Sequence, residues 1–239
     1  MGKKGEVVWI YWSQGFSQAP ALVTKCVQSW RTLNPDYDIR LLDSSSIKDY
    51  LDMGEVLASD RIKKASFAAK SDVIRINLLA QHGGIWVDST LMCMQPLDQW
   101  LEKDYSFFAF SNPGPDRMLS SWFLAADRSS YIVKEWQAAS QQYWSTWRWR
   151  RKYYWFHYLF GSLYQSDAQF KREWDKAYKI EASGAHILTP FRQKFFEAAT
   201  EERRKLLHEA QPQVLKLTYK CIKDGYPEGS MIDYLLNKM

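Results

Sequence analysis

One apolar strand of this chain is predicted to end on an acid. In the stretch SDVIRINLLAQHGGIWVDST, the run Ile85-Trp86-Val87 leads into Asp88, and two hydroxyl residues follow at once. Burying a carboxylate costs several kcal/mol unless the group is paired or coordinated. A strand end that opens into a cleft, where the carboxylate meets a ligand, removes that cost.

A second pair of charged residues precedes this strand. Asp72 and Arg75 are three positions apart in a segment with helical periodicity, so both project from one helix face. Taken alone, they could be a surface ion pair worth a few tenths of a kcal/mol. The helix runs through Gly83-Gly84 straight into the Asp88 strand, however. We therefore expect Asp72 and Arg75 to lie near Asp88.

The elements that would position these residues alternate between strand and helix. This order is typical of βαβ units, and ligands of such sheets bind at the carboxyl ends of the strands. The rule places Trp12, Asp43 and Asp88 around one crevice. We predict strands over 6–12, 37–43, 85–88, 105–111 and 121–126, and helices over 21–33, 47–52 and 66–82. A mainly helical region follows residue 130, and 214–220 is either a late strand or an extended tail segment.

Composition excludes several classes of protein. Of the 239 residues, 46% are hydrophobic and 25% charged, as in ordinary globular proteins, and 12 are Trp, a residue suited to stacking on sugars or bases. A net charge of +5 favours an anionic ligand or an acidic membrane surface without requiring nucleic acid. Three Cys without a CxxC pair indicate neither a disulfide framework nor a zinc site. No apolar run reaches the length of a membrane span, so we expect a cytoplasmic protein.

The motif SD-x-x-R, followed by GG-x-aromatic-x-D, resembles glycosyltransferases of the family that contains yeast initiation-type mannosyltransferases and bacterial capsular polysaccharide synthesis proteins. The large clostridial glucosylating toxins carry the same elements. The opening VVWIYWSQGFSQAPALVTKCVQSWRTLNPDYDIRLLD is similar to that of the capsular proteins, as is LTYK near the end. The resemblance is strong from Glu6 to about Trp100 and patchy beyond.

The resemblance implies a GT-A-type, Rossmann-like mixed sheet flanked by helices, with a helical C-terminal part. It implies a single domain over 1–239, with a nucleotide-sugar-binding part at about 6–128 and a mainly helical acceptor part at about 129–239. The implied reaction moves a sugar, with retention, from a nucleotide sugar, expected to be UDP-linked, to a hydroxyl of a glycan or lipid-linked acceptor in polysaccharide synthesis. The alternative is a transferase-like protein that only binds glycan or nucleotide.

The resemblance also assigns roles by motif position, with Asp88 and Arg75 as the catalytic residues. Trp9 would stack on uracil, and Ser71 and Asp72 would lie beside the nucleoside and donor sugar. Arg75 would contact the sugar and diphosphate, and Trp86 would lie beside the diphosphate. Asp88 would be the first acid of an Asp-x-Asp motif.

This sequence departs from the motif at one position. Thr90 stands where the second acid of Asp-x-Asp is expected. Either Asp88 and Thr90 hold Mn²⁺ or Mg²⁺ weakly, or a basic residue replaces the ion and makes the protein metal-independent. Lys220 of LTYK is the sequence-based candidate for that residue.

The stretch YWSTWRWRRKYYWFHYLF, residues 143–160, mixes aromatic and basic side chains. It could be helices with aromatics in the core, an interfacial helix in peripheral contact with a membrane, or a platform for the acceptor sugar. We expect no nucleic-acid partner, because no recognised nucleic-acid module surrounds the stretch.

Overall fold

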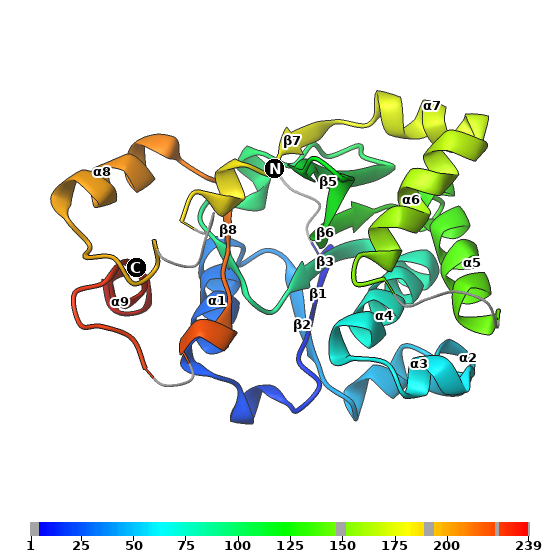
Figure 1. Cartoon of the computed structure of the whole chain (residues 1–239), viewed down its shortest axis with the longest axis horizontal. Coiled ribbons are helices and arrows are strands. Elements are labelled where there is room, and N and C mark those ends of the chain that lie inside the picture. Colours follow the sequence, from blue (N-terminus) through cyan, green and yellow to red (C-terminus); the bar gives the residue numbers. More distant parts are fainter. Residues whose placement is uncertain (1–4, 147–151, 189–193, 223–224, 239) are drawn as a thin grey trace.

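A computed structural model describes residues 5–146, 152–188, 194–222 and 225–238. Its centre is a mixed six-stranded sheet in the order β2-β1-β3-β6-β5-β7 (Figure 1). Neighbouring strands are parallel in the pairs β1–β2, β1–β3 and β5–β7, and antiparallel in β3–β6 and β5–β6. The strands are β1 (Val7–Tyr11), β2 (Asp38–Leu42), β3 (Gly84–Asp88), β5 (Phe107–Gly114), β6 (Arg117–Ala126) and β7 (Lys179–Glu181).

Strands β1 and β3 end side by side. In their parallel register Trp9 lies opposite Trp86 and Tyr11 opposite Asp88. The carboxyl end of β2 lies on the other side of β1, with Leu42 opposite Tyr11. The predicted meeting of three strand ends at one edge of the sheet is therefore confirmed.

Helix α4 (Phe67–His82) begins at Ser66, whose hydroxyl accepts a hydrogen bond from the backbone N–H of Ala69. It ends at the glycine pair Gly83-Gly84, where both residues have positive φ, +68° and +88°. A Cβ on Gly84 would lie 2.6 Å from the carbonyl oxygen of Val7. Only glycine allows the chain to turn so tightly from α4 into β3, and this turn sets the position of Asp88.

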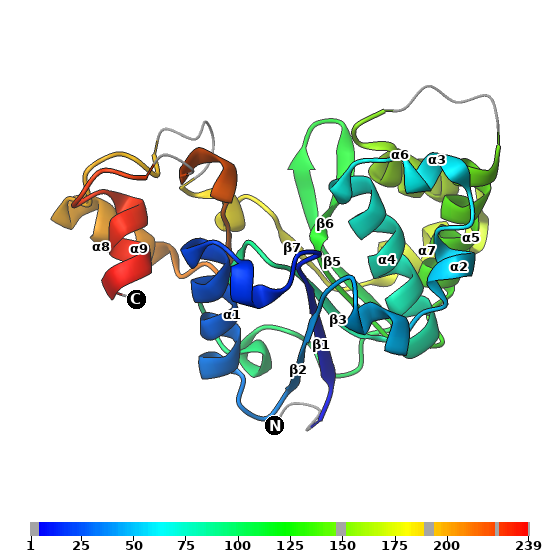
Figure 2. The ribbon, with the colours of Figure 1, turned by 90° about the horizontal axis from the view of Figure 1, so that it is seen from below.

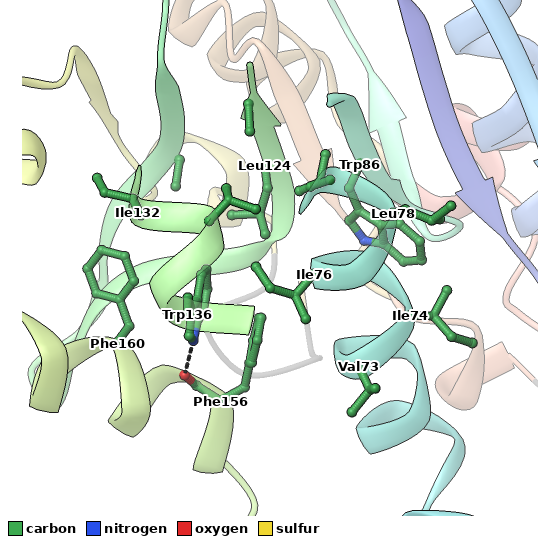
Figure 3. Packing of buried hydrophobic residues seen from close by; sticks show 14 of the residues in the cluster. Val73, Ile74, Ile76, Leu78, Trp86, Leu124, Ile132, Trp136, Phe156 and Phe160 are labelled. Carbon is green, nitrogen blue, oxygen red and sulfur yellow. Dashed lines mark hydrogen bonds between the residues drawn. The ribbon is translucent and has the colours of Figure 1, made fainter. Parts of the chain in front are cut away.

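Helices cover both faces of the sheet (Figures 1 and 2). On one face, α4 packs against α5, and α6 packs against β6 and α7. Figure 3 shows the core between them, where the indole N–H of Trp136 donates to the carbonyl oxygen of Phe156 at 2.9 Å. The helices of this side are α2 (Met53–Val56), α3 (Asp60–Lys63), α4, α5 (Tyr131–Ser145), α6 (Trp155–Ser166) and α7 (Ala168–Lys176).

The opposite face carries α1 (Ala21–Leu33) and, beyond it, the C-terminal part of the chain (Figure 2). A second sheet forms here, in which β4 (Leu91–Cys93) pairs antiparallel with β8 (Val214–Lys216). The predicted late strand is thus shorter than expected and lies outside the main sheet. The remaining elements are α8 (Glu201–Ala210), α9 (Met231–Lys238) and the 3-10 helices η1 (Phe16–Gln18), η2 (Ser46–Asp49), η3 (Leu97–Gln99), η4 (Gly184–His186) and η5 (Tyr219–Ile222).

Candidate active site

Three residues predicted from the sequence meet at the end of β3. The Nη2 atom of Arg75 lies 3.3 Å from Oδ1 of Asp72 and 3.2 Å from Oδ1 of Asp88. Arg75 is only 4% exposed. The pair on α4 is therefore no surface ion pair but part of a buried charge cluster that includes the strand-end acid.

The Arg75 guanidinium is fixed in place by further contacts. Its Nε atom donates to the carbonyl oxygen of Ser71 at 3.3 Å, and Nη1 donates to the carbonyl oxygen of Ser121. Nη2 lies 3.4 Å from the Ser71 hydroxyl. The guanidinium also lies over the indole ring of Trp86, at 5.1 Å from the ring centroid. Ser71 and Trp86, both predicted site residues, thus hold the arginine.

Asp88 contacts two further groups. The indole N–H of Trp86 donates to its Oδ1 at 3.0 Å, and the Lys216 ammonium donates to its Oδ2 at the same distance. Lys216 Nζ also donates to the Thr90 hydroxyl at 2.8 Å. Pairing of β8 with β4 causes this contact, because it sets Lys216 opposite Leu91, next to Thr90.

The surroundings of Asp88 and Asp72 shift the pKa values of these two acids in opposite directions. Burial alone would raise the pKa of Asp88, but the Lys216 ammonium and the Arg75 guanidinium outweigh it and hold this pKa below its usual range. Burial raises the pKa of Asp72 to about 7, against the influence of Arg75 and aided by the nearby charge of Asp88. Asp88 is therefore a carboxylate at neutral pH, and Asp72 is the more easily protonated of the two acids.

The cluster lies in the wall of a cavity of about 540 Å³. Burial lowers the pKa of His157, which also lines it, to about 3, so that this imidazole is neutral. The positive side chains of the described wall thus outnumber the negative ones, and the cavity favours an anion. Its charged lining consists of Arg75, Arg117, Lys152 and Lys216 against Asp72 and Asp88.

A second cavity, of about 830 Å³, adjoins the first. Arg117 and His157 line both cavities, so these two side chains lie between them. Its other side chains include Asn112, Gln165 and Tyr158, all able to hydrogen-bond with hydroxyl groups. The site therefore has room for two ligands next to each other.

Trp9 lies apart from these cavities. It is 1% exposed, its indole N–H donates to the carbonyl oxygen of Gly83 at 2.9 Å, and its ring packs edge-on against Tyr50. A ring so enclosed has no free face for a base. The expectation that Trp9 stacks on uracil is therefore corrected: in this structure Trp9 holds the turn between α4 and β3.

Replacing Trp9 by Ala is expected to lower the free energy of unfolding by about 3–5 kcal/mol, because a large buried ring and a buried hydrogen bond are lost. Urea denaturation followed by tryptophan fluorescence or circular dichroism measures this. Uridine nucleotide affinity of the fraction that stays folded is expected to be unchanged. A stable Trp9→Ala protein with weakened nucleotide binding would restore the original assignment.

Lys216 is the basic residue that the sequence interpretation missed. Lys220, its candidate for this position, is exposed on η5, four residues further along. Strand alternation could not separate the two lysines, because residues 216 and 220 would lie on the same face of an extended segment. In the structure β8 ends at Lys216, and Lys220 lies beyond it on η5.

The side chains at Asp88 and Thr90 do not fit a divalent cation as they stand. No group of three or more His, Cys, Asp or Glu side chains suited to a metal occurs within the described ranges. The two oxygens that were expected to bind the ion both contact the Lys216 ammonium instead. A positive ammonium between two ligand atoms repels a second cation.

The aromatic-basic stretch 143–160 is partly outside the described residues, which omit 147–151. Of its described aromatics, Trp144, Trp155, Phe156 and Phe160 are buried, as the core interpretation expects. Tyr143, Tyr153 and Tyr154 line the charged cavity, as the platform interpretation expects. No helix among the described residues is both long enough and apolar enough to span a membrane. Peripheral membrane contact through this stretch stays a prediction.

The sequence model of a family described as capsular polysaccharide synthesis protein matches residues 1–235 of the chain. The chain belongs to this family. Among curated proteins, this capsular polysaccharide synthesis family member is 27% identical to the O-glycosyltransferase braB of Annulohypoxylon truncatum and 30% identical to the glycosyltransferase afumC of Aspergillus fumigatus. Each alignment covers 57% of the chain, and 37% and 40% of the respective relatives. The family member thus spans less than half the length of these relatives.

Among solved structures, the family member resembles the glycosyltransferase GlyE of Streptococcus pneumoniae, with a TM-score of 0.50 and 11% identity. The likeness covers 98% of this chain and 59% of GlyE. At this identity the likeness concerns the fold alone. The expected fold class, a GT-A-type mixed α/β sheet flanked by helices, is confirmed.

Proposed function

We propose that this protein is a glycosyltransferase that moves a sugar from a nucleotide-sugar donor, UDP-linked, to a hydroxyl of a glycan or lipid-linked acceptor. The observation that carries the proposal is the cavity at the end of β3, where a buried Arg75 and a partly buried Lys216 flank the Asp88 carboxylate. A diphosphate needs positive charge aimed at it, and sugar hydroxyls need acceptors such as carboxylates. This cavity wall offers both within one cluster.

In the proposed arrangement the diphosphate lies against Arg75 and Lys216. The donor sugar places hydroxyl groups against Asp72 and Asp88, whose side chains are 14% and 23% exposed and so accessible from the cavity. Ser71 and Trp86 serve by holding Arg75 and Asp88 in position. The roles of Asp88 and Arg75 are thus catalytic in this proposal, through the charge that develops on the leaving diphosphate.

Trp12 replaces Trp9 as the proposed partner of the base. It follows β1 at the carboxyl edge of the sheet, is only partly buried, and packs edge-on against Tyr219 at 5.2 Å between ring centroids. Tyr219 in turn is three residues beyond Lys216. The residue before it, Tyr11, lies opposite Asp88 in the sheet. A partly exposed indole at this strand end is suited to stack on uracil, an interaction worth roughly 1–3 kcal/mol.

The acceptor is proposed to lie in the second cavity, with its reacting hydroxyl near Arg117 and His157, which line both cavities. These proposed positions differ in part from the predicted division of the domain into a donor part at about 6–128 and an acceptor part at about 129–239. Arg117 comes from the donor part, and Lys216 from the C-terminal part completes the donor site. Transfer with retention of configuration is part of the proposal and follows from the family resemblance.

The proposed function is tested by incubating the protein with a panel of UDP- and GDP-sugars, in EDTA and in Mn²⁺, and measuring released nucleoside diphosphate. We expect hydrolysis or transfer with at least one UDP-sugar and loss of the signal in an Asp88→Asn variant. Binding of UDP without turnover of any donor would favour the alternative, a transferase-like binding protein. Absence of both binding and turnover would refute the proposal.

A further inference from the structure

Lys216 occupies the position that a bridging cation would take in the proposed donor site. Its Nζ atom lies 3.0 Å from Oδ2 of Asp88 and 2.8 Å from the Thr90 hydroxyl, so both groups contact the same ammonium. Thr90 contributes no negative charge, so this pair of oxygens suits one monovalent ammonium better than a divalent ion. The substitution of an acid by Thr90 and the presence of Lys216 are therefore complementary.

The ammonium has one hydrogen left for a ligand. A lysine carries three N–H donors, and the two contacts above account for two of them. The Lys216 side chain is 22% exposed and lines the charged cavity, so the third N–H can be directed at a ligand there. On the other side of Asp88, Arg75 adds a second fixed positive charge at 3.2 Å from Oδ1.

We propose that the Lys216 ammonium is a built-in replacement for the divalent cation, which binds the donor diphosphate and stabilises it as a leaving group without metal. This inference rests on the proposed function and names the cation of that site. In the transfer step the bond between the anomeric carbon and the phosphate oxygen breaks, and its electron pair stays on the diphosphate beside Lys216 and Arg75. The acceptor oxygen forms the new bond to the anomeric carbon, and its proton passes to the departing diphosphate.

The test is calorimetric titration of UDP into the wild-type protein, in EDTA and in Mn²⁺. We expect UDP to bind in EDTA, with an affinity that changes less than threefold in Mn²⁺. Lys216→Met is expected to weaken UDP binding at least tenfold in EDTA. Lys103→Met, an exposed lysine outside the cavity lining, is expected to leave it unchanged. Lys220→Met decides between the two lysines and is expected to behave like Lys103→Met.

A designed variant tests whether the site binds a divalent cation once the ammonium is removed. Thr90→Asp combined with Lys216→Ala removes the ammonium and supplies a second acid. Mn²⁺ alone is expected to raise the melting temperature of this variant but not that of the wild type. This readout requires neither donor nor turnover.

The outcomes separate the two proposals. UDP binding by the wild type that appears only with Mn²⁺, or a Lys216→Met protein that folds and binds UDP normally in EDTA, would overturn the role of Lys216 and leave the glycosyltransferase proposal intact. Absence of UDP binding under every condition would overturn both. Because the EDTA comparison uses the wild type, it decides the question even where a variant does not fold.

Discussion

Asp88→Asn is expected to lower turnover of the donor sugar about a hundredfold or more. The carboxylate is fixed between Arg75, Lys216 and the indole N–H of Trp86, at 3.2, 3.0 and 3.0 Å. The amide of Asn has the same size but no charge. Its NH₂ group is a hydrogen-bond donor, and so are the Lys216 and Arg75 side chains that it would face. Loss of a positioned charge in a transferase site commonly costs several kcal/mol in the transition state, which gives this factor.

The measurement is kcat with a saturating donor. Asp38→Asn serves as the matched control, because Asp38 makes an ion pair with Arg40 on the surface of the sheet, where the Asp38 side chain is 43% exposed. The Asp38→Asn variant is expected to keep the wild-type kcat, because a surface ion pair contributes little. An Asp88→Asn protein that turns over the donor at the wild-type rate would mean that the Asp88 charge has no role in catalysis.

Arg75→Met is the second change with a large expected effect, and it acts on stability as well as on activity. Arg75 is buried and separates two acids, so its removal leaves Asp72 and Asp88 facing one another without their shared cation. Breaking a buried ion pair in this way costs about 3–5 kcal/mol.

A double variant distinguishes the two effects. Asp72→Asn added to Arg75→Met removes one unpaired carboxylate and is expected to restore part of the free energy of unfolding, measured by urea denaturation. Donor turnover is expected to stay lost, because the guanidinium is still missing. Recovery of turnover together with stability would mean that Arg75 acts only by holding the fold.

The meeting of Asp72, Arg75 and Asp88 could be predicted because all three lie in one short stretch. The helical spacing of the first two fixes a shared face, and a tight glycine turn leaves the following strand little freedom. The glycines could be read in the sequence as the end of the helix. The structure adds their physical reason, a backbone contact with Val7 that leaves no room for a Cβ.

Lys216 could not be placed in the same way. It is 126 residues from Thr90, and the pairing of β8 with β4 that joins them leaves no local pattern in either segment. The error at Trp9 has a related cause. Both faces of the main sheet are covered by helices, so β1 is apolar throughout and its sequence does not show which side each residue faces. Only the structure separates the enclosed Trp9 from the partly exposed Trp12.

In the proposed donor complex the Arg75–Asp88–Lys216 cluster binds the diphosphate of the nucleotide sugar. A crystal structure of the protein with UDP, grown in EDTA, would show this contact. We expect a diphosphate oxygen within about 3 Å of Lys216 Nζ, a second within reach of the Arg75 guanidinium, and uracil against Trp12. UDP bound in another cavity, with the three side chains contacting one another as in the unbound protein, would contradict it.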